Sequence, residues 1–322
     1  MPDIGQSQFS KDVLWGITAT ACLAVAALYL PFIGLFIGLL IPLPLIFYRI
    51  KLGRFFSGVI LCTVLAIVGM AFGEGGLQSG AFFLYFGLTG VILAEAFSRN
   101  LSVENTVLAT AGVVLGLAVA VLFVYALFSV ENLWGLITIY LRKNLELTVA
   151  LYKEIGVPPE KIGLIQDSLD SILYVFVRII PGILSAFTLL MVWANLLMAR
   201  PILKRGNLFC PDFGRLNRWK SPEHLVWIAI GSGFLLLFPL SGVKMLGLNG
   251  LIVLVVIYLF QGLAIVSYYF EKKQFPLILR GVIYTVVAVQ QFLILAVILV
   301  GFLDVWSDFR RLKQKKKNSE VP

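Results

Sequence analysis

Long apolar blocks alternate with short polar connectors along almost the whole chain. Each block holds about 18–25 residues, the length that an α-helix needs to cross a hydrocarbon core of about 30 Å. Backbone groups inside such a core have no water to bond, so each block is predicted to be helical. The predicted blocks are residues 13–30, 32–48, 55–72, 80–97, 106–129, 172–199, 224–240, 247–270 and 276–303.

These blocks predict an all-α, polytopic transmembrane helical bundle that forms one membrane domain. Of the 322 residues, 60% are hydrophobic and 13% are charged, whereas a soluble domain is about half apolar and a quarter charged. The predicted regions are a six-helix membrane core at 1–199, a basic cytoplasmic loop at 200–223, about three C-terminal membrane segments at 224–303 and a basic cytoplasmic tail at 304–322.

The region 130–171 is the one sizeable exposed piece of the predicted core. Apolar residues recur at helical spacing from Trp134 to Val149, with charged residues between them. Gly156 ends this helix, and Pro159 suits the first turn of a second helix, which is expected to run on into the sixth block. The region therefore predicts an outer helical hairpin that projects from the membrane or lies on its surface. The plainer alternative is a simple extracellular cap.

The placement of lysine and arginine predicts the orientation. The formal net charge is +9, and the basic residues gather in alternate connectors, which stay on the cytoplasmic side of a membrane. The N-terminus, Arg205 and Lys272 are therefore predicted inside and Lys153 outside. We expect a multi-pass protein of a bacterial inner (plasma) membrane whose certain partner is the lipid bilayer. Orientation accounts for the basic charge, so nucleic acid is not an expected partner.

The last block conflicts with this orientation. A straight helix over 276–303 places the basic tail that begins at Arg310 outside the cell. Gln290 and Gln291 lie in the middle of the block, where amides exposed to lipid are costly. A re-entrant or broken hairpin that turns near these glutamines returns the tail to the cytoplasm. It is slightly favoured over a straight ninth helix whose glutamines face protein.

No pattern of catalytic or metal-binding residues appears in the sequence. The single histidine, His224, stands at the start of an apolar block, and metalloprotease, P-loop and nucleophile-elbow motifs are absent. Cys22, Cys62 and Cys210 lie far apart, without the spacing of metal ligands. The sequence therefore predicts no enzyme, no cofactor and no metal site.

Ionisable groups within apolar blocks carry most of the functional signal, because each is costly unless it is paired or solvated. Arg178 interrupts the sixth block, where it can either snorkel outward or bind an anion in an outward-facing pocket. Glu95 is expected to pair with Arg99 at the next turn. The candidate substrate-binding residues are Arg178, Glu74 on a Gly-rich outer loop and, as weaker candidates, Gln78, Tyr85, Asp170 and Asn195.

A series of loose motifs runs through most of the chain. It comprises a proline-broken first pair of blocks ending at Pro42-Leu43-Pro44 before a basic turn, the Gly-rich segment 73–80, the outer amphipathic insert, the entry Trp219-Lys220-Ser221-Pro222 and the ending from Gly301 to Arg310. In this order the motifs resemble the YybS-like family of uncharacterised bacterial multipass membrane proteins.

That family looks related to the substrate-binding (S) components of energy-coupling-factor (ECF) transporters. The resemblance implies that residues 1–199 form an S-component-like core holding a small nutrient, such as a vitamin, near the outer face. It also implies a transmembrane coupling subunit and ATPases as partners, with the subunit contacting a small-residue stripe on the first helix. The matching stripe is Gly16, Thr20 and Ala24, although such stripes more often pack a bundle internally.

The leading hypothesis is therefore the binding or uptake of a small molecule by an S-component-like membrane protein. The chain has no ATP-binding motif, so transport driven by ATP needs partner subunits. The main alternative is a membrane scaffold or regulator acting through the outer hairpin or the basic loop, and an intramembrane enzyme comes third. A pocket lined by Arg178 or Glu74 favours binding, whereas a filled core with these residues at the surface favours the scaffold.

Overall fold

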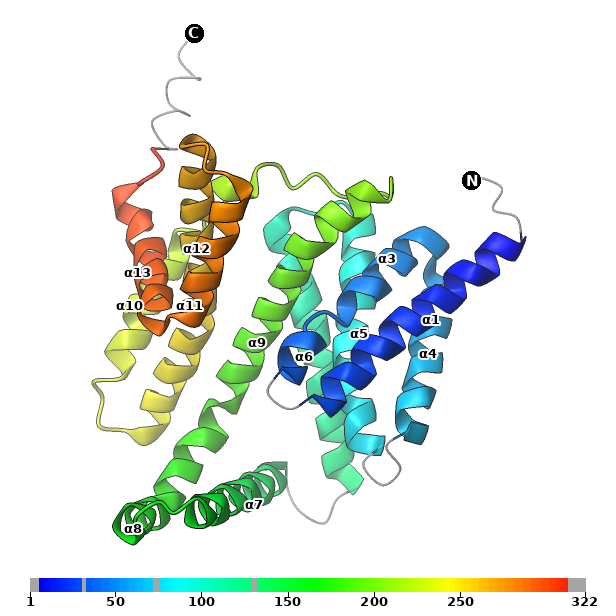
Figure 1. The fold of residues 1–322 in the computed structure, drawn as a ribbon. Coiled ribbons are helices and arrows are strands. Elements are labelled where there is room, and N and C mark those ends of the chain that lie inside the picture. The colour runs from blue at the N-terminus through cyan, green and yellow to red at the C-terminus, as the bar shows by residue number, and fades with distance from the viewer. Residues whose placement is uncertain (1–5, 31–32, 72–75, 129–132, 312–322) are drawn as a thin grey trace. The chain divides into compact units, whose positions relative to one another are not determined.

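A computed structural model describes residues 6–30, 33–71, 76–128 and 133–311, and this part of the chain is all-α (Figure 1). Seven of its helices are long and apolar enough to cross a membrane, and a bent helix pair is an eighth candidate. The predicted polytopic helical bundle is therefore confirmed. The chain packs as two compact units, of which unit 1 is Met1–Val121 with Phe187–Phe213, and unit 2 is Leu122–Ala186 with Gly214–Pro322. The four regions predicted from the sequence were defined by their position relative to the membrane. The packing of the helices does not test that position, so these regions stay a prediction.

Unit 1 is built around α5. This helix packs against α3 and α4, and α1 packs against α2, α3 and α4. The second predicted block is broken between α2 and α3, and Pro42 occupies the first turn of α3, where its missing N–H costs no hydrogen bond. The helices of unit 1 are α1 (Gln6–Tyr29), α2 (Gly34–Gly38), α3 (Pro42–Leu52), α4 (Arg54–Ala71), α5 (Gly76–Ser98), α6 (Val103–Phe128) up to Val121, and α9 (Leu169–Arg205) from Phe187.

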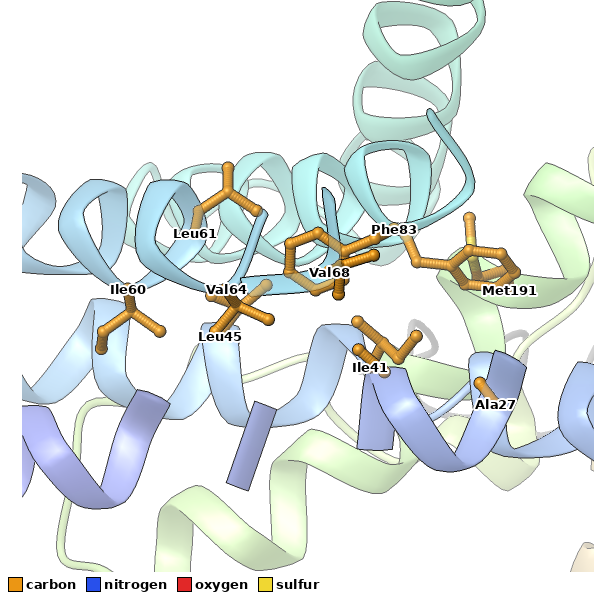
Figure 2. Packing of buried hydrophobic residues seen from close by; sticks show 11 residues of the cluster. Ala27, Ile41, Leu45, Ile60, Leu61, Val64, Val68, Phe83 and Met191 are labelled. Atoms are coloured by element: carbon orange, nitrogen blue, oxygen red, sulfur yellow. The ribbon is translucent and has the colours of Figure 1, made fainter. Parts of the chain in front are cut away.

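The core of unit 1 is a filled cluster of aliphatic and aromatic side chains from α1, α3, α4, α5 and α9 (Figure 2). Leu45, Val64 and Phe83 in this cluster are completely buried. Close approach of α3 and α5 depends on Gly90, because a Cβ there would lie 2.7 Å from the carbonyl oxygen of Pro42. Apolar packing of this kind holds membrane helices together without help from water.

The small-residue stripe on α1 faces this core. Gly16, Thr20 and Ala24 are all buried, and a Cβ on Gly16 would lie 2.7 Å from the side chain of Ile60. The hydroxyl of Thr20 donates to the carbonyl oxygen of Gly16 at 2.7 Å, so it needs no outside partner. The stripe packs α1 against its neighbours inside unit 1, and its implied role as the contact for a coupling subunit stays a prediction.

Unit 2 is organised by α11, which packs against α10, α13 and η2. Two further helices, α7 and α8, pack against each other and form the predicted hairpin of the region 130–171. The elements of unit 2 are α7 (Leu133–Glu154), α8 (Pro159–Asp167), α9 up to Ala186, the 3₁₀ helix η2 (Leu216–Arg218), α10 (His224–Leu235), α11 (Ser241–Lys272), α12 (Leu277–Val289) and α13 (Gln291–Ser307).

The turn between α7 and α8 has the geometry that its sequence predicts. Gly156 adopts a φ of 80°, which glycine tolerates best, and the N–H of Val157 bonds back to the carbonyl oxygen of Tyr152 at 3.0 Å. This closes α7 as a Schellman-type cap, and Pro159 stands in the first turn of α8. However, α8 does not run on into the sixth block, because the chain breaks at Ser168 before α9 begins.

Two C-terminal segments differ from straight, full-length spans. The predicted block 224–240 contains only the 12-residue α10, about 18 Å of helix, which is too short to cross a hydrocarbon core. The block 276–303 is broken at Gln290, whose backbone is extended, and α12 and α13 are bent by 102°. The Tyr269 hydroxyl near the end of α11 donates to the carbonyl oxygen of Phe309 at 2.9 Å. The chain therefore turns back, and the straight ninth helix is ruled out.

Candidate functional site

The predicted site residues are divided between the two units. Tyr85 and Asn195 belong to unit 1, whereas Arg178 and Asp170 belong to unit 2. Glu74 lies outside the described residues. Gln78 lies in α5, but its side chain is also outside the part that the structure describes. The set therefore has to be judged residue by residue.

In unit 1, Tyr85 contacts the C-terminal half of α9, and Asn195 lies within that half. The Tyr85 hydroxyl and the Thr188 hydroxyl lie 2.5 Å apart. The completely buried Asn195 donates from Nδ2 to the carbonyl oxygens of Leu39, at 2.9 Å, and Met191, at 2.8 Å. These bonds join α5 and the α2–α3 turn to α9. The immediate role of both residues is thus to hold helices together.

In unit 2, Arg178 and Asp170 lie on the surface. The Arg178 guanidinium stacks over the ring of Tyr174, 3.5 Å from its centroid, and donates to the carbonyl oxygen of the same residue at 3.1 Å. Asp170 accepts from Arg142 at 2.6 Å, which ties α9 to α7. Arg178 therefore satisfies itself on its own helix, as the snorkelling alternative expects, and lines none of the hollows described below.

The charged site that stands out is a cluster of three arginines around Glu95 in unit 1, here called the arginine cluster. Arg49 and Arg54 both donate to the Glu95 carboxylate, Arg54 at 2.5 Å to Oε1. Arg99, four residues after Glu95 and just past the end of α5, lies 3.9 Å from the same oxygen. Gly53, with a φ of 92°, makes the sharp turn between α3 and α4 that brings Arg49 and Arg54 together.

The arginine cluster borders an open hollow of about 410 Å³ between α5 and α6. Its charged rim is the arginine cluster itself, and the rest of its lining is Val91, Ile92, Ala96, Leu101, Ala109, Thr110 and Val113. A second hollow of about 370 Å³ lies on another side of Arg49 and is lined by Arg49, Ile50, Gly53, Ala94, Ser98 and Phe209. Small-molecule sites occupy about 300–1,000 Å³, so either hollow is large enough for a ligand group.

The cluster carries an excess of positive charge. Its three guanidiniums face a single carboxylate, which leaves a formal excess of two positive charges. The side chain of Arg49 is only 11% exposed, whereas those of Arg54 and Arg99 are 77% and 69% exposed. Guanidinium is always charged and offers a planar fork of donors that fits carboxylate or phosphate. The arrangement can therefore accept an anion without losing Glu95.

A family model described as a predicted membrane protein (DUF2232) matches residues 18–305. The chain belongs to this family. It is also 23% identical over 300 residues to the uncharacterized protein YybS of Bacillus subtilis (strain 168), an alignment covering 90% of this chain and 93% of that protein. No solved structure matches significantly.

These matches confirm the resemblance to the YybS-like family. The family is described as a predicted membrane protein, and the seven long apolar helices of this chain agree with a multi-pass membrane protein. The descriptions of the two matches mention no substrate, transporter or ATPase. The relation to ECF S components therefore stays a prediction.

A second charged group in the DUF2232 chain, at the end of unit 2, is a fully buried ion pair. Asp304 and Arg310 form an ion pair at 2.8 Å, and both side chains are inaccessible to solvent. Arg310 also donates to the carbonyl oxygens of Asn217, at 2.9 Å, and Trp219, at 2.8 Å. Gln261 donates to Asp304 at 3.2 Å and accepts from the N–H of Ser221 at the same distance. This network is structural, because it clamps the loop 214–223 and the end of α13 onto α11.

The arginine cluster escaped residue-by-residue sequence reasoning because two of its three ion pairs join residues that are far apart in the sequence. Glu95 and Arg99 are one turn apart, so their pairing was predictable, but Arg49 and Arg54 reach Glu95 across 46 and 41 positions of sequence. The available signal was that Glu95 is a lone carboxylate at the end of an apolar block, opposite a connector with several basic residues. The α3–α4 connector and the end of α5 lie at the same end of these helices, so their charged side chains meet there.

Proposed function

We propose that this DUF2232 protein binds a small anionic molecule in its N-terminal unit, at the arginine cluster and the adjoining hollow. The observation that carries the proposal is the convergence of three guanidiniums on one carboxylate at the rim of a space of about 410 Å³. The negative charge of Glu95 balances the charge of one arginine, so two positive charges remain to attract a ligand. Charge-assisted, forked hydrogen bonds of this kind are the strong ones in anion recognition.

This proposal keeps the part of the S-component hypothesis that concerns ligand binding, but it places the ligand at the arginine cluster. The arginine cluster stands on connectors that are predicted to face the cytoplasm, whereas an S component holds its nutrient near the outer face. Uptake with a coupling subunit and ATPases therefore remains a separate proposal. The proposal is of binding, with no reaction assigned.

The anion site is tested with the full chain in detergent. Inorganic phosphate and succinate are titrated into the parent protein, into the double variant Arg54→Gln/Arg99→Gln and into the control variant Arg178→Gln. These arginines are exposed, so their loss should leave the fold intact. An anion at 100 times its dissociation constant stabilises the folded state by about 2.7 kcal/mol, seen as a rise in melting temperature.

We expect at least one of the two anions to raise the melting temperature of the parent and of the control variant, but not that of the double variant. An equal rise in all three proteins means that the anion acts elsewhere, and no rise in the parent means that the cluster only links the helix ends. Either result overturns the proposal.

A scaffold or regulator is the second candidate, favoured by the surface next to the buried Arg310. Arg215, Arg218 and Lys272 line a shallow polar hollow of about 200 Å³ with Glu271, on a loop that Arg310 holds in place. A fixed basic surface of this kind suits an acidic partner. Charge-reversal of Arg215 and Arg218 should then release a co-purifying partner from native membranes, while Arg178→Gln should not.

A further inference from the structure

We infer that the anion bound at the arginine cluster is the headgroup of an anionic phospholipid, whose hydrocarbon part lies along α5 and α6. The inference rests on the proposed function, since it names the ligand class of the same site. Three independent features of the hollow support it: the chemistry of its walls, its depth along the helices and a buried hydroxyl without a partner.

The walls of the hollow are almost entirely hydrocarbon. Apart from the arginine cluster and Thr110, every lining residue is Val, Ile, Leu or Ala. A small hydrated anion uses only the charged rim and leaves these walls without a partner. An amphiphile matches both parts, because its charged end meets the guanidiniums and its hydrocarbon covers the apolar walls.

The hollow extends from the end of the membrane spans towards their middle. Arg49, Arg54 and Arg99 stand at or just beyond the ends of the apolar spans Gly34–Leu52, Arg54–Ala71 and Ser79–Ser98. In a bilayer this is the level of the lipid headgroups. Ala109 and Val113 lie six and ten residues into α6, which is about 9 and 15 Å from its first residue. A phospholipid extends over the same two levels, with its headgroup beside the arginines and its hydrocarbon chains beside Ala109 and Val113.

Thr110 supplies a polar group below the charged rim. Its side chain is completely buried and lines the hollow, yet its hydroxyl has no hydrogen-bond partner among the described residues. A buried hydroxyl without a partner is unfavourable. The ester carbonyls of a phospholipid lie just below its phosphate and accept hydrogen bonds, so they match a donor at this position.

The charge of the cluster selects the kind of phospholipid. A formal excess of two positive charges in a partly apolar setting favours a headgroup with net negative charge over a zwitterionic one. We therefore expect phosphatidylglycerol to bind and phosphatidylcholine, with its quaternary ammonium, to bind weakly. Free inorganic phosphate shares the anion but lacks the hydrocarbon.

The test measures binding of these three probes to the full chain in detergent, by native mass spectrometry for the lipids and by thermal shift for inorganic phosphate. The variants are Arg54→Gln/Arg99→Gln, Ala109→Trp, Thr110→Val and the control Arg178→Gln. Ala109 is exposed and lines the hollow, so a tryptophan there fills the hollow without disturbing the core of unit 1.

We expect the parent to prefer phosphatidylglycerol over phosphatidylcholine by about ten-fold, the effect of one good charged contact. The double arginine variant should lose this preference. Ala109→Trp and Thr110→Val should weaken phosphatidylglycerol binding and leave any phosphate response unchanged, and the control should match the parent.

The outcomes separate the two proposals. If phosphate binds through Arg54 and Arg99 but the two lipids bind equally, the anion site stands and the lipid inference is overturned. If phosphatidylglycerol binds Ala109→Trp as well as it binds the parent, the lipid does not occupy the hollow and the inference is again overturned. If no probe depends on Arg54 and Arg99, both the inference and the proposed function fail.

Discussion

Arg310 is a buried charge that holds two segments of unit 2 together. Its guanidinium is buried against Asp304 and two carbonyl oxygens of the loop 214–223. Removing one member of a buried ion pair leaves the other without compensation in a poorly solvated place. Arg310→Ala should therefore cost far more than the loss of an ordinary surface arginine.

We expect Arg310→Ala to lower the free energy of unfolding of unit 2 by about 3–5 kcal/mol. Thermal unfolding in detergent, followed by tryptophan fluorescence, measures the change. Arg311→Ala is the matched control, because Arg311 is the next residue and is exposed. The double variant Asp304→Leu/Arg310→Met removes both charges and should recover part of the loss. Equal melting temperatures for Arg310→Ala and Arg311→Ala would show that the pair contributes nothing.

Arg178 illustrates how far an isolated charge can be interpreted from sequence. Its position in an apolar run predicted either a snorkelling residue or an anion ligand, and sequence alone could not decide between them. The local geometry favours snorkelling, since the guanidinium stacks on Tyr174 one turn earlier, and a role in anion binding stays a prediction. An exposed contact of this kind contributes about 0.5–1 kcal/mol.

Arg178→Lys should accordingly stay within about 1 kcal/mol of the parent in stability, because lysine can occupy the same place over the ring. It should also retain any co-purified ligand to the same extent, as should Arg178→Gln. Melting temperature and native mass spectrometry of the three proteins check this. A selective loss of ligand in both variants would restore Arg178 as a binding residue.

At the scale of elements, α13 depends on a close crossing with α11. A Cβ on Gly301 would lie 2.1 Å from the carbonyl oxygen of Tyr258, and a Cβ on Gly262 would lie 2.1 Å from that of Val297. Backbone meets backbone at this crossing, so only glycine fits on either side. The break at Gln290 was predictable, because two adjacent amides in an apolar block are costly to expose. The glycine crossing was not, because nothing in sequence pairs Gly262 with Gly301.

Gly301→Ala should separate α11 from α13 and destabilise unit 2 by about 1–3 kcal/mol, the usual cost of overpacking. The control is Gly281→Ala on α12, where an added Cβ meets no atom within 4 Å. In an exposed helix alanine is more favourable than glycine by about 1 kcal/mol, so the control should be neutral or slightly stabilising. Opposite signs of the two melting-temperature changes are the expected result. Equal changes would mean that the helices do not cross at Gly301.

The short length of α10 was not predicted, because hydropathy identifies a run of apolar residues and does not locate the residue at which a helix ends. The block 224–240 is apolar throughout, but Gly231, Gly233 and Pro239 lie near its end, and the chain leaves the α-helix after Leu235 in tight turns. Composition therefore located the segment correctly and overestimated its length. Packing against α11 holds this short helix.

At the scale of the molecule, unit 2 has two chemically distinct ends. Near the start of α11, the side chain of Asn249 accepts from the N–H of Gly182 at 2.5 Å and donates to the carbonyl oxygen of Arg178 at 2.9 Å. Further back along α9 lies Asp170, which is paired with α7. At the other end of α11, Glu271 pairs with Arg215 at 3.3 Å, and Tyr269 contacts Phe309.

The positive-charge rule assigns these two ends to opposite sides of the membrane, since Lys272 and the basic loop fall at one of them and the α7–α8 hairpin at the other, and this sidedness stays a prediction. It could not predict the division into packing units. That division runs through α9, at residues 186 and 187 of one continuous helix. Hydropathy describes where a helix meets lipid, but not which helices it packs against.

The last prediction concerns the sidedness of unit 2. In a background without Cys22, Cys62 and Cys210, single cysteines are placed at Lys153, Lys272 and Arg311 and labelled with a membrane-impermeant maleimide. Lys272 and Arg311 should react only after the membrane is permeabilised, because the α12–α13 turn returns the chain to the end of α11 where the basic residues gather.

Lys153→Cys should react in intact cells, because the outer hairpin lies at the opposite end of α11, a helix of 32 residues and about 48 Å. Labelling of positions 153 and 272 from the same side would contradict the predicted orientation. Labelling of position 311 in intact cells, with position 272 protected, would instead mean that α12 and α13 cross the membrane together, contrary to the contact between Tyr269 and Phe309.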